Sequence, residues 1–107
     1  MAEINADMAK SVTVETILTL PESSNMVNNI TIIGAAGAGR TVTVTANTQT
    51  ASALDPDAYE APDENSVVNT ADGLPHTFLF PVGTMINKIK CTPSAVFAFS
   101  VKCSSAR

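Results

Sequence analysis

The sequence predicts an all-β protein, an antiparallel β-sandwich of the jelly-roll or Greek-key type with about six to eight short strands. Apolar and polar residues alternate with a period of two in several segments, which is typical of half-buried strands. Gly, Pro, Asn and Asp separate these segments at fairly even spacing, and no segment has the 3.6-residue period of an amphipathic helix. With 107 residues the chain can bury one core without disulfide or metal staples, so we expect a single domain.

The N-terminal ten residues are polar and acidic and lack the composition of a core strand. We therefore predict that residues 1–10 form an arm and that residues 11–107 form the sandwich. The first strand of the sandwich is expected at residues 11–20, where apolar residues such as Val12 and Leu18 share one face.

Two segments rich in β-branched residues, 29–33 and 41–45, are predicted to pair as a hairpin around the Gly- and Ala-rich residues 34–40. The glycines suggest a phosphate-binding turn, but such a turn leads from a strand into a helix, and residues 41–45 have a strand pattern. The glycine spacing also differs from G-x-G-x-x-G. We interpret residues 34–40 as a hairpin loop, with a mobile loop that orders against a partner as the alternative.

The middle of the chain has weaker patterns. Residues 46–54 stay unassigned, whereas short strands are predicted at residues 66–69 and 76–80, with a turn at Asp72-Gly73 between them. His76 has no Cys or His companion at metal-ligand spacing, and no Ser-His-Asp arrangement is indicated. We therefore expect a protein that is not an enzyme and that binds no cofactor.

Residues 85–103 are the strongest strand signal and are predicted to form a hairpin with a turn at residues 92–94. Phe97 and Phe99 lie on the apolar face of its second half, and Phe78 and Phe80 repeat the same spacing one strand earlier, so we expect these four rings to form the core. Cys91 and Cys103 would then lie on different arms, about 25 Å apart, too far for a disulfide. They are expected to be free thiols.

The composition excludes two classes of partner. Only 15% of the residues are charged, against about 25% in most soluble domains, so the surface is lightly charged and suits a protein packed against neighbours. The formal net charge of -4, with six Lys and Arg in total, gives no electrostatic footprint for nucleic acid. The apolar runs are shorter than the roughly 20 residues that cross a bilayer, and the first ten residues lack the features of a signal peptide, so we expect no membrane association.

Charge is unevenly distributed along the chain. Residues 55–72 contain six acidic residues and no Lys or Arg. The acids are Asp55, Asp57, Glu60, Asp63, Glu64 and Asp72. An EF-hand is excluded because Glu60 and Ser66 stand where that loop needs Gly and Glu, so we expect a solvated acidic loop, with looser calcium binding as the alternative. Residues 85–107 carry Lys and Arg but no acid. We hypothesise that the acidic loop meets a basic surface on a neighbouring subunit.

The chain resembles the small capsid decoration, or cement, proteins of bacteriophages. The resemblance lies in the Thr-, Val- and Ala-rich strands at residues 11–20 and 41–46, the Phe-Leu-Phe-Pro-Val-Gly-Thr link at residues 78–84, and the closing segment 85–103. It implies a structural virion protein, made in the host cytoplasm and located on the capsid exterior. Such a protein binds the major capsid protein or other virion subunits, typically as a homo-oligomer, and stabilises the assembled shell through repeated contacts.

Two other functions remain open from the sequence: a phage tail or adaptor subunit, and a soluble carbohydrate- or ligand-binding β-module. For the partner surface, we predict contacts from the N-terminal arm, the acidic loop and the lysines of the last strands. The candidate residues are Glu3, Ile4, Met8, Asp55, Asp57, Glu60, Lys88, Lys90 and Lys102.

Overall fold

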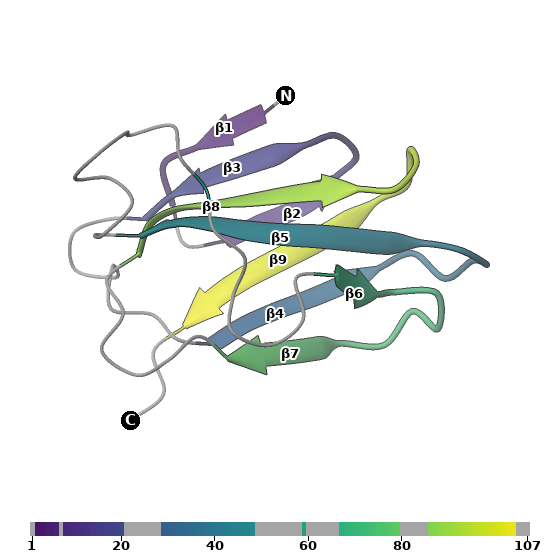
Figure 1. The fold of residues 1–107 in the computed structure, drawn as a ribbon. Helices are drawn as coiled ribbons and strands as arrows, with labels where there is room; N and C mark the ends of the chain where they lie inside the picture. Colours follow the sequence, from purple (N-terminus) through teal and green to yellow (C-terminus); the bar gives the residue numbers. More distant parts are fainter. Residues whose placement is uncertain are drawn as a thin grey trace.

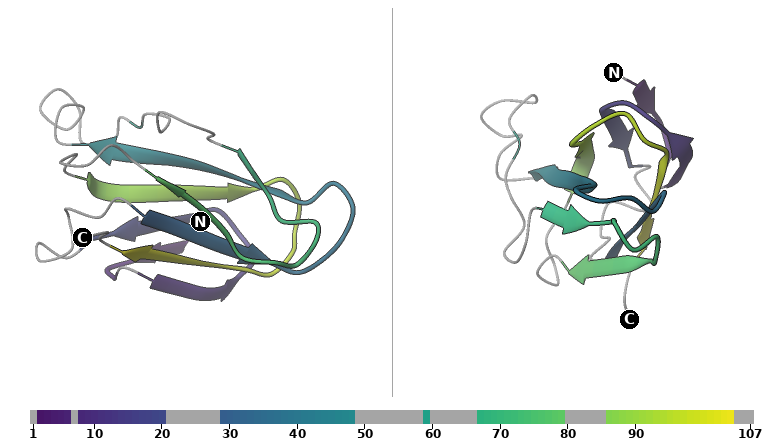
Figure 2. Two further views of the ribbon diagram at one scale, coloured as in Figure 1. Left: turned by 90° about the horizontal axis from the view of Figure 1, so that it is seen from below. Right: turned by 90° about the vertical axis from the view of Figure 1, so that its right-hand side faces the viewer.

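The computed structural model describes residues 2–6, 8–20, 29–48, 59, 67–79 and 86–104, and it confirms the predicted β-sandwich (Figure 1). The described residues form nine strands and no helix, and these strands make two sheets that pack face to face (Figure 2). Among neighbouring strands in the two sheets, only the pair of β1 and β3 is parallel. The jelly-roll connection stays a prediction.

Sheet A contains five strands and sheet B contains four. In spatial order, sheet A consists of β1 (Ala2–Ile4), β3 (Thr16–Thr19), β8 (Ile86–Pro93), β5 (Thr41–Thr48) and β6 (Val67–Asn69). Sheet B consists of β2 (Met8–Val12), β9 (Phe99–Ser104), β4 (Asn29–Gly34) and β7 (His76–Leu79). The predicted short strands near residues 66–69 and 76–80 are therefore confirmed as β6 and β7, which end and begin beside the predicted turn.

The core lies between the sheets and is mainly aliphatic. Phe97 and Phe99 are buried as predicted, with ring centroids 6.2 Å apart and planes tilted by 54°. The side chains of Phe78 and Phe80, the other two expected core rings, lie outside the described residues. The fully buried side chains around Phe99 come from both sheets: Leu18, Ile30, Ile32, Ile86, Ile89, Val42, Val44 and Val101.

Both predicted hairpins are wrong, for one physical reason. Strands β4 and β5 lie in different sheets, and so do β8 and β9, so each connecting loop crosses from one layer to the other. A strand that buries alternate side chains has the same period-2 pattern whether its chain neighbour lies beside it or across the core. The pattern therefore predicts the buried face correctly but not the partner strand.

The predicted strand at residues 11–20 is also two strands. The chain leaves sheet B after β2 and enters sheet A at β3, and Val14 between them is 45% exposed. The pairing of β2 with β9 shifts between Ala9 and Val12, where Ser11 has a φ of 53°. This is a β-bulge, which bends an edge strand away from regular pairing.

The N-terminal segment is built into both sheets. Strand β1 extends sheet A beside β3, and β2 extends sheet B beside β9. Ala9 is buried, and Ile4 and Val12 pack against the core. The expected boundary between an arm at residues 1–10 and a domain at residues 11–107 does not coincide with an edge of the sandwich, because β2 crosses it. Together with the break at residues 13–15, this accounts for a strand number above the expected six to eight.

Cys91 and Cys103 form no disulfide with each other, as predicted, and both are buried. The predicted separation of about 25 Å depended on the hairpin and falls with it, because β8 lies in sheet A and β9 in sheet B. Burial raises the pKa of the Cys91 thiol, and the electrostatic influence of Cys103 raises it further. A thiol held in its protonated form is a poor nucleophile, so Cys91 is a core side chain.

Candidate interaction surfaces

Four connections gather at one end of the sandwich, the right-hand end in Figure 1. They are residues 13–15, 35–40, 70–75 and 94–98, and we call this region the loop end. Backbone hydrogen bonds join the connections to one another. The amide of Ala35 donates to the carbonyl of Ala98 at 2.8 Å, and the amide of Gly37 donates to the carbonyl of Ala71 at 2.9 Å. Three of the four connections, residues 35–40, 70–75 and 94–98, are therefore held together by backbone hydrogen bonds.

Arg40 holds the Gly- and Ala-rich connection in place. Its Nη1 donates to the carbonyl oxygens of Ala35 and Ala36, at 3.0 and 2.8 Å, and its guanidinium lies 5.4 Å from the centroid of the Phe97 ring. Its own carbonyl accepts a hydrogen bond from the amide of Thr70 at 3.0 Å. The sequence predicted a permissive loop at residues 34–40, but the arginine at the end of that loop fixes it instead.

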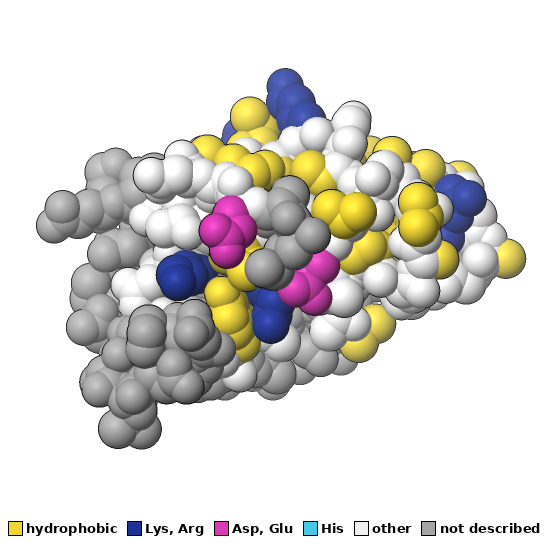
Figure 3. Space-filling model, turned by 90° about the horizontal axis from the view of Figure 1, so that it is seen from above, with side chains coloured by type: hydrophobic (Ala, Val, Ile, Leu, Met, Phe, Trp, Pro, Cys, Tyr) yellow, Lys and Arg dark blue, Asp and Glu magenta, His cyan; other side chains and the backbone are white. Residues whose placement is uncertain are grey.

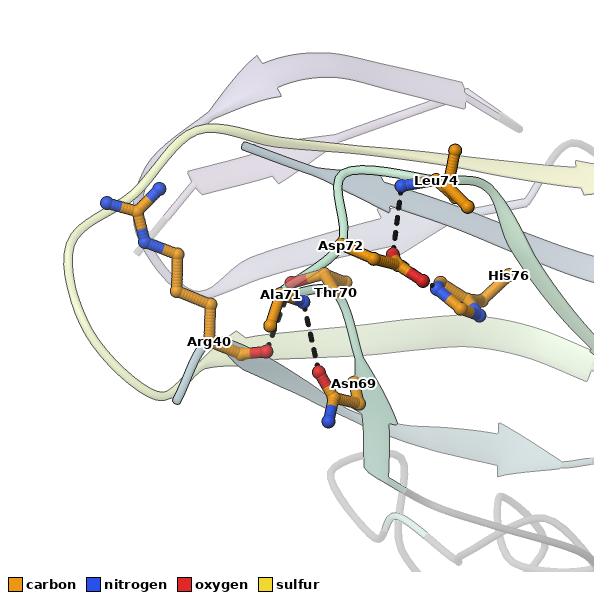
Figure 4. A network of polar contacts seen from close by, with 7 residues as sticks. All are labelled: Arg40, Asn69, Thr70, Ala71, Asp72, Leu74 and His76. Atoms are coloured by element: carbon orange, nitrogen blue, oxygen red, sulfur yellow. Dashed lines mark hydrogen bonds and ion pairs between the residues drawn. The ribbon is translucent and has the colours of Figure 1, made fainter. Parts of the chain in front are cut away.

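A second set of side chains shapes the connection between β6 and β7 (Figure 4). Asn69 Oδ1 accepts a hydrogen bond from the amide of Ala71, and Asp72 Oδ1 accepts one from the amide of Leu74. Asp72 Oδ1 also lies 2.9 Å from His76 Nε2. The hydrogen bond with His76, followed by that from Leu74, lowers the pKa of Asp72 below its usual 3.8.

His76 thus has an acidic partner that the sequence reading did not identify. The described residues place no serine hydroxyl or cysteine thiol in hydrogen-bond contact with its ring. Nucleophilic catalysis needs the histidine to activate such a group. The Asp72–His76 contact, together with the bond from Leu74, spans the turn between β6 and β7.

Gly34 is where the loop end meets the core, and a larger residue there is expected to be destabilising. A Cβ at this position would lie 2.7 Å from Thr70 Oγ1 and 3.1 Å from Phe97 Cε2, and Thr70 is fully buried. Gly34→Ala should lower the free energy of unfolding by about 1–3 kcal/mol through overpacking, measured by urea denaturation. Gly39→Ala is the comparison, because a Cβ there meets nothing within 4 Å and the cost comes only from the φ of +71°. Unchanged stability of Gly34→Ala would contradict the close packing of Thr70.

The exposed side chains of the loop end are mainly apolar. Val96 is 84% exposed, Leu74 59% and Val14 45%, and two of the four connections, residues 35–40 and 94–98, also contain exposed alanines. Seen from above, hydrophobic side chains are frequent toward this end (Figure 3). The charged side chains of the loop end already have partners: Glu15 Oε2 accepts from Thr92 Oγ1, Arg40 binds carbonyls, and Asp72 contacts a histidine. The large exposed side chains left to contact another molecule, Val14, Leu74 and Val96, are therefore apolar.

A second surface is the outer face of sheet B, which we call the sheet B face. Met8, Lys102, Thr31 and Thr77 lie in one row across its four strands, and Ser100 and Ile33 pair in the next row. A hollow of about 240 Å³ lies over this face and is lined in part by Met8, Lys10 and Lys102. The surface combines two lysines with hydroxyl and apolar side chains.

The structure separates the predicted lysine surface into two. Lys88 and Lys90 pair with Thr19 and Ile17 on sheet A, whereas Lys102 lies on sheet B. The prediction of one positively charged face is therefore wrong: the three lysines lie in three different rows of two sheets whose outer faces point in opposite directions. Seen from above, acidic and basic side chains lie close together over part of the surface (Figure 3).

The other predicted contact residues are also dispersed. Glu3 is exposed on β1, Ile4 is partly buried against the core, and Met8 is 40% exposed on β2. Asp55, Asp57 and Glu60 lie outside the described residues. Tyr59, within the acidic segment, is described, and Lys90 Nζ lies 4.2 Å from the centroid of its ring.

Comparison of the chain with protein-family models, with curated proteins and with solved structures finds no match. Its function must therefore be argued from its own surfaces. Among the described residues, no group of three or more His, Cys, Asp or Glu side chains could hold a metal ion. In the same part of the chain, no helix is long and apolar enough to cross a membrane.

The sequence reading missed the loop end and Lys10. Val96 lies beside the predicted turn and on the polar side of its segment. An apolar residue at such a position is a sequence signal for an exposed interaction surface. Arg40 gave a weaker signal, as a lone cation directly after a glycine-rich run. The sheet topology brings the four connections together at one end. The residues of a single connection do not reveal that topology.

Proposed function

We propose that the chain is a structural virion protein, a capsid decoration or cement protein that binds an assembled shell and stabilises it through repeated contacts. The observation that carries the proposal is the loop end, where apolar side chains are exposed on a backbone that hydrogen bonds and Arg40 hold fixed. The resemblance of the sequence to decoration proteins indicates the kind of partner.

A fixed apolar surface favours docking to a protein shell for two reasons. Exposed apolar patches that are not scattered mark interaction sites. A backbone that is already ordered loses little conformational entropy on binding, so more of the contact energy becomes affinity. The four connections emerge from both sheets, so the sandwich serves as a rigid support for them.

The energy of one such contact is modest, and repetition makes it useful. Full burial of a valine or leucine side chain is worth about 1.5–3 kcal/mol, so the apolar side chains of one loop end give only moderate affinity. On a shell, many copies bind at equivalent positions, and any contact that spans two shell subunits gains effective concentration. Weak single contacts then add to the stability of the whole particle.

The test is binding of purified protein to shells from which it has been removed. Val96→Asp should reduce occupancy on the shell at least about tenfold, because a carboxylate replaces an apolar side chain that becomes buried. Occupancy is measured by co-sedimentation of the protein with the particles across a range of concentrations. The unfolding midpoint should stay close to that of the wild type, since Val96 is 84% exposed.

Val67→Asp is the matched control, because Val67 is 50% exposed on β6, outside the four connections of the loop end, and receives the same change of charge. It should retain wild-type occupancy. Equal loss of occupancy in both variants, or no loss in Val96→Asp, would contradict docking through the loop end.

A second experiment dissociates the particles into heads and tails. A protein that remains with the tails would contradict the capsid assignment and favour a tail or adaptor subunit.

A further inference from the structure

We infer that the sheet B face binds the acidic segment of residues 55–64 from a second copy of the chain, so that copies associate in a head-to-tail manner. The inference concerns contacts between copies and does not depend on whether the other partner is a capsid shell. It is carried by the shape of the sheet B face, by its charge, and by the contact between Tyr59 and Lys90.

The sheet B face has a groove suited to an extended segment. The hollow of about 240 Å³ beside the lysines adjoins one of about 250 Å³ that reaches Gly73 and Ala98 at the loop end. Both are lined by Ser11, Ile33 and Ser100, so they adjoin each other. The bulge forms the shared wall: the amide of Ser11 donates to Ser100 Oγ at 3.1 Å, with the φ of Ser11 at 53°.

The groove is positively charged, and no acidic side chain of the described residues neutralises it. Lys10 and Lys102 line it together with Met8 and Ile33, and no acid lines either hollow among the described residues. Neither lysine makes an ion pair with another described residue. A protein segment that covers this groove must supply carboxylates to the two ammonium groups, or their desolvation opposes binding.

The chain itself carries the complementary charge. Residues 55–64 contain five acids and no Lys or Arg: Asp55, Asp57, Glu60, Asp63 and Glu64. Tyr59 lies within the segment and Leu54 directly precedes it, and both supply apolar surface that suits Met8 and Ile33. Two lysines are too few to track a nucleic-acid backbone on a chain with net charge -4, so an acidic protein segment is the better match.

The contact of Tyr59 with Lys90 places this one residue of the segment on the side of the molecule opposite to the groove. Lys90 points outward from sheet A, in register with Ile17 of β3, and its Nζ lies 4.2 Å from the Tyr59 ring centroid. Tyr59 therefore lies on the sheet A side, whereas Lys10 and Lys102 lie on the sheet B face. Two copies can join these unlike surfaces, and such contacts generate rings or open chains.

The test is the concentration dependence of association, measured by sedimentation velocity and native mass spectrometry at about 0.02 M and about 0.5 M salt. The wild type should form oligomers at low salt and weaken at least about tenfold at high salt, because the contact pairs exposed charges. Lys102→Glu should weaken association at least about tenfold. Lys88→Glu is the matched control, with the same change of charge on the opposite sheet, and should stay within about twofold of the wild type.

A charge exchange identifies the occupant. Asp55→Lys/Asp57→Lys copies should not associate with themselves, but they should associate with Lys102→Glu copies when the two are mixed. A wild type that is monomeric at both ionic strengths, equal loss in Lys88→Glu, or failure of the mixture to associate would each overturn the inference. Shell binding is measured separately with Val96→Asp. A monomer that binds shells overturns only the self-association, and an oligomer that does not bind shells overturns only the decoration function.

Discussion

Replacement of Phe99 by alanine is expected to lower the free energy of unfolding by about 3–5 kcal/mol. Phe99 is 1% exposed and lies on β9, between β2 and β4 in sheet B. The centroid of its ring is 6.2 Å from that of Phe97, and the Arg40 guanidinium lies over the Phe97 ring. The alanine variant would leave a cavity at this junction that the two sheets cannot close. Since domains of this size are stable by about 5–15 kcal/mol, the loss would be a large share of the total.

The measurement is urea or guanidinium unfolding followed by circular dichroism. Phe99→Leu should cost less than Phe99→Ala, because it keeps part of the buried volume. Val67→Ala, at a position that is 50% exposed, should stay within about 0.5 kcal/mol of the wild type. A loss below about 1 kcal/mol in Phe99→Ala would contradict the position of Phe99 in the core.

The sequence predicts the fold class and the buried faces well, because burial leaves a direct mark on composition. In β4, Ile30 and Ile32 are buried while Thr31 and Ile33 are more exposed, and in β5 Val42 and Val44 are buried between partly exposed threonines. Period-2 alternation predicts each of these faces. It cannot distinguish pairing within a sheet from packing across the core, since both place the same side chains inward.

Loop length was a further signal that the sequence reading could have used. Two-residue loops are the commonest hairpin connections, and hairpin loops are usually two to about five residues long. Residues 35–40 exceed that range and residues 94–98 reach its upper end, and the layers of a sandwich lie about 10 Å apart. Longer connections with small residues are compatible with a crossing between sheets. The lysine surface was wrong for the same reason as the hairpins, because Lys88, Lys90 and Lys102 were assigned to one sheet.

The loop end and the N-terminal strands were missed for different reasons. The loop end exists only when four connections are brought together, and its exposed apolar residues are few in each connection. Strands β1 and β2 lie at the edges of their sheets. An edge strand can leave most of its side chains exposed, so the composition of these two strands is polar. Ala9 is the only residue of β2 that is fully buried, and one alanine gives no periodic pattern.

Removal of residues 1–12 is expected to abolish the stable fold or to lower its free energy of unfolding by at least about 4 kcal/mol. The truncation takes away β1 and β2, and with them the buried Ala9 and the packing of Ile4 and Val12 against the core. Each lost net hydrogen bond costs about 1 kcal/mol, and apolar burial adds about 25 cal/mol per Å². The truncated chain would also present β3 and β9 as new sheet edges, which favours aggregation.

The same truncation separates two accounts of the N-terminal segment. If residues 1–10 were an arm on a neighbour, the shortened chain would keep its unfolding transition and lose only its attachment to particles. The sheet pairing predicts instead that the isolated, truncated protein unfolds at a lower temperature and scatters more light, before any partner is added.

Ala9→Asp provides a test without truncation, because it places a carboxylate at a 4% exposed position opposite Val101 and should destabilise the fold by several kcal/mol. Lys10→Asp, at the adjacent exposed position, should leave stability nearly unchanged. Wild-type stability in both Ala9→Asp and the truncated chain would return the segment to the role of an arm.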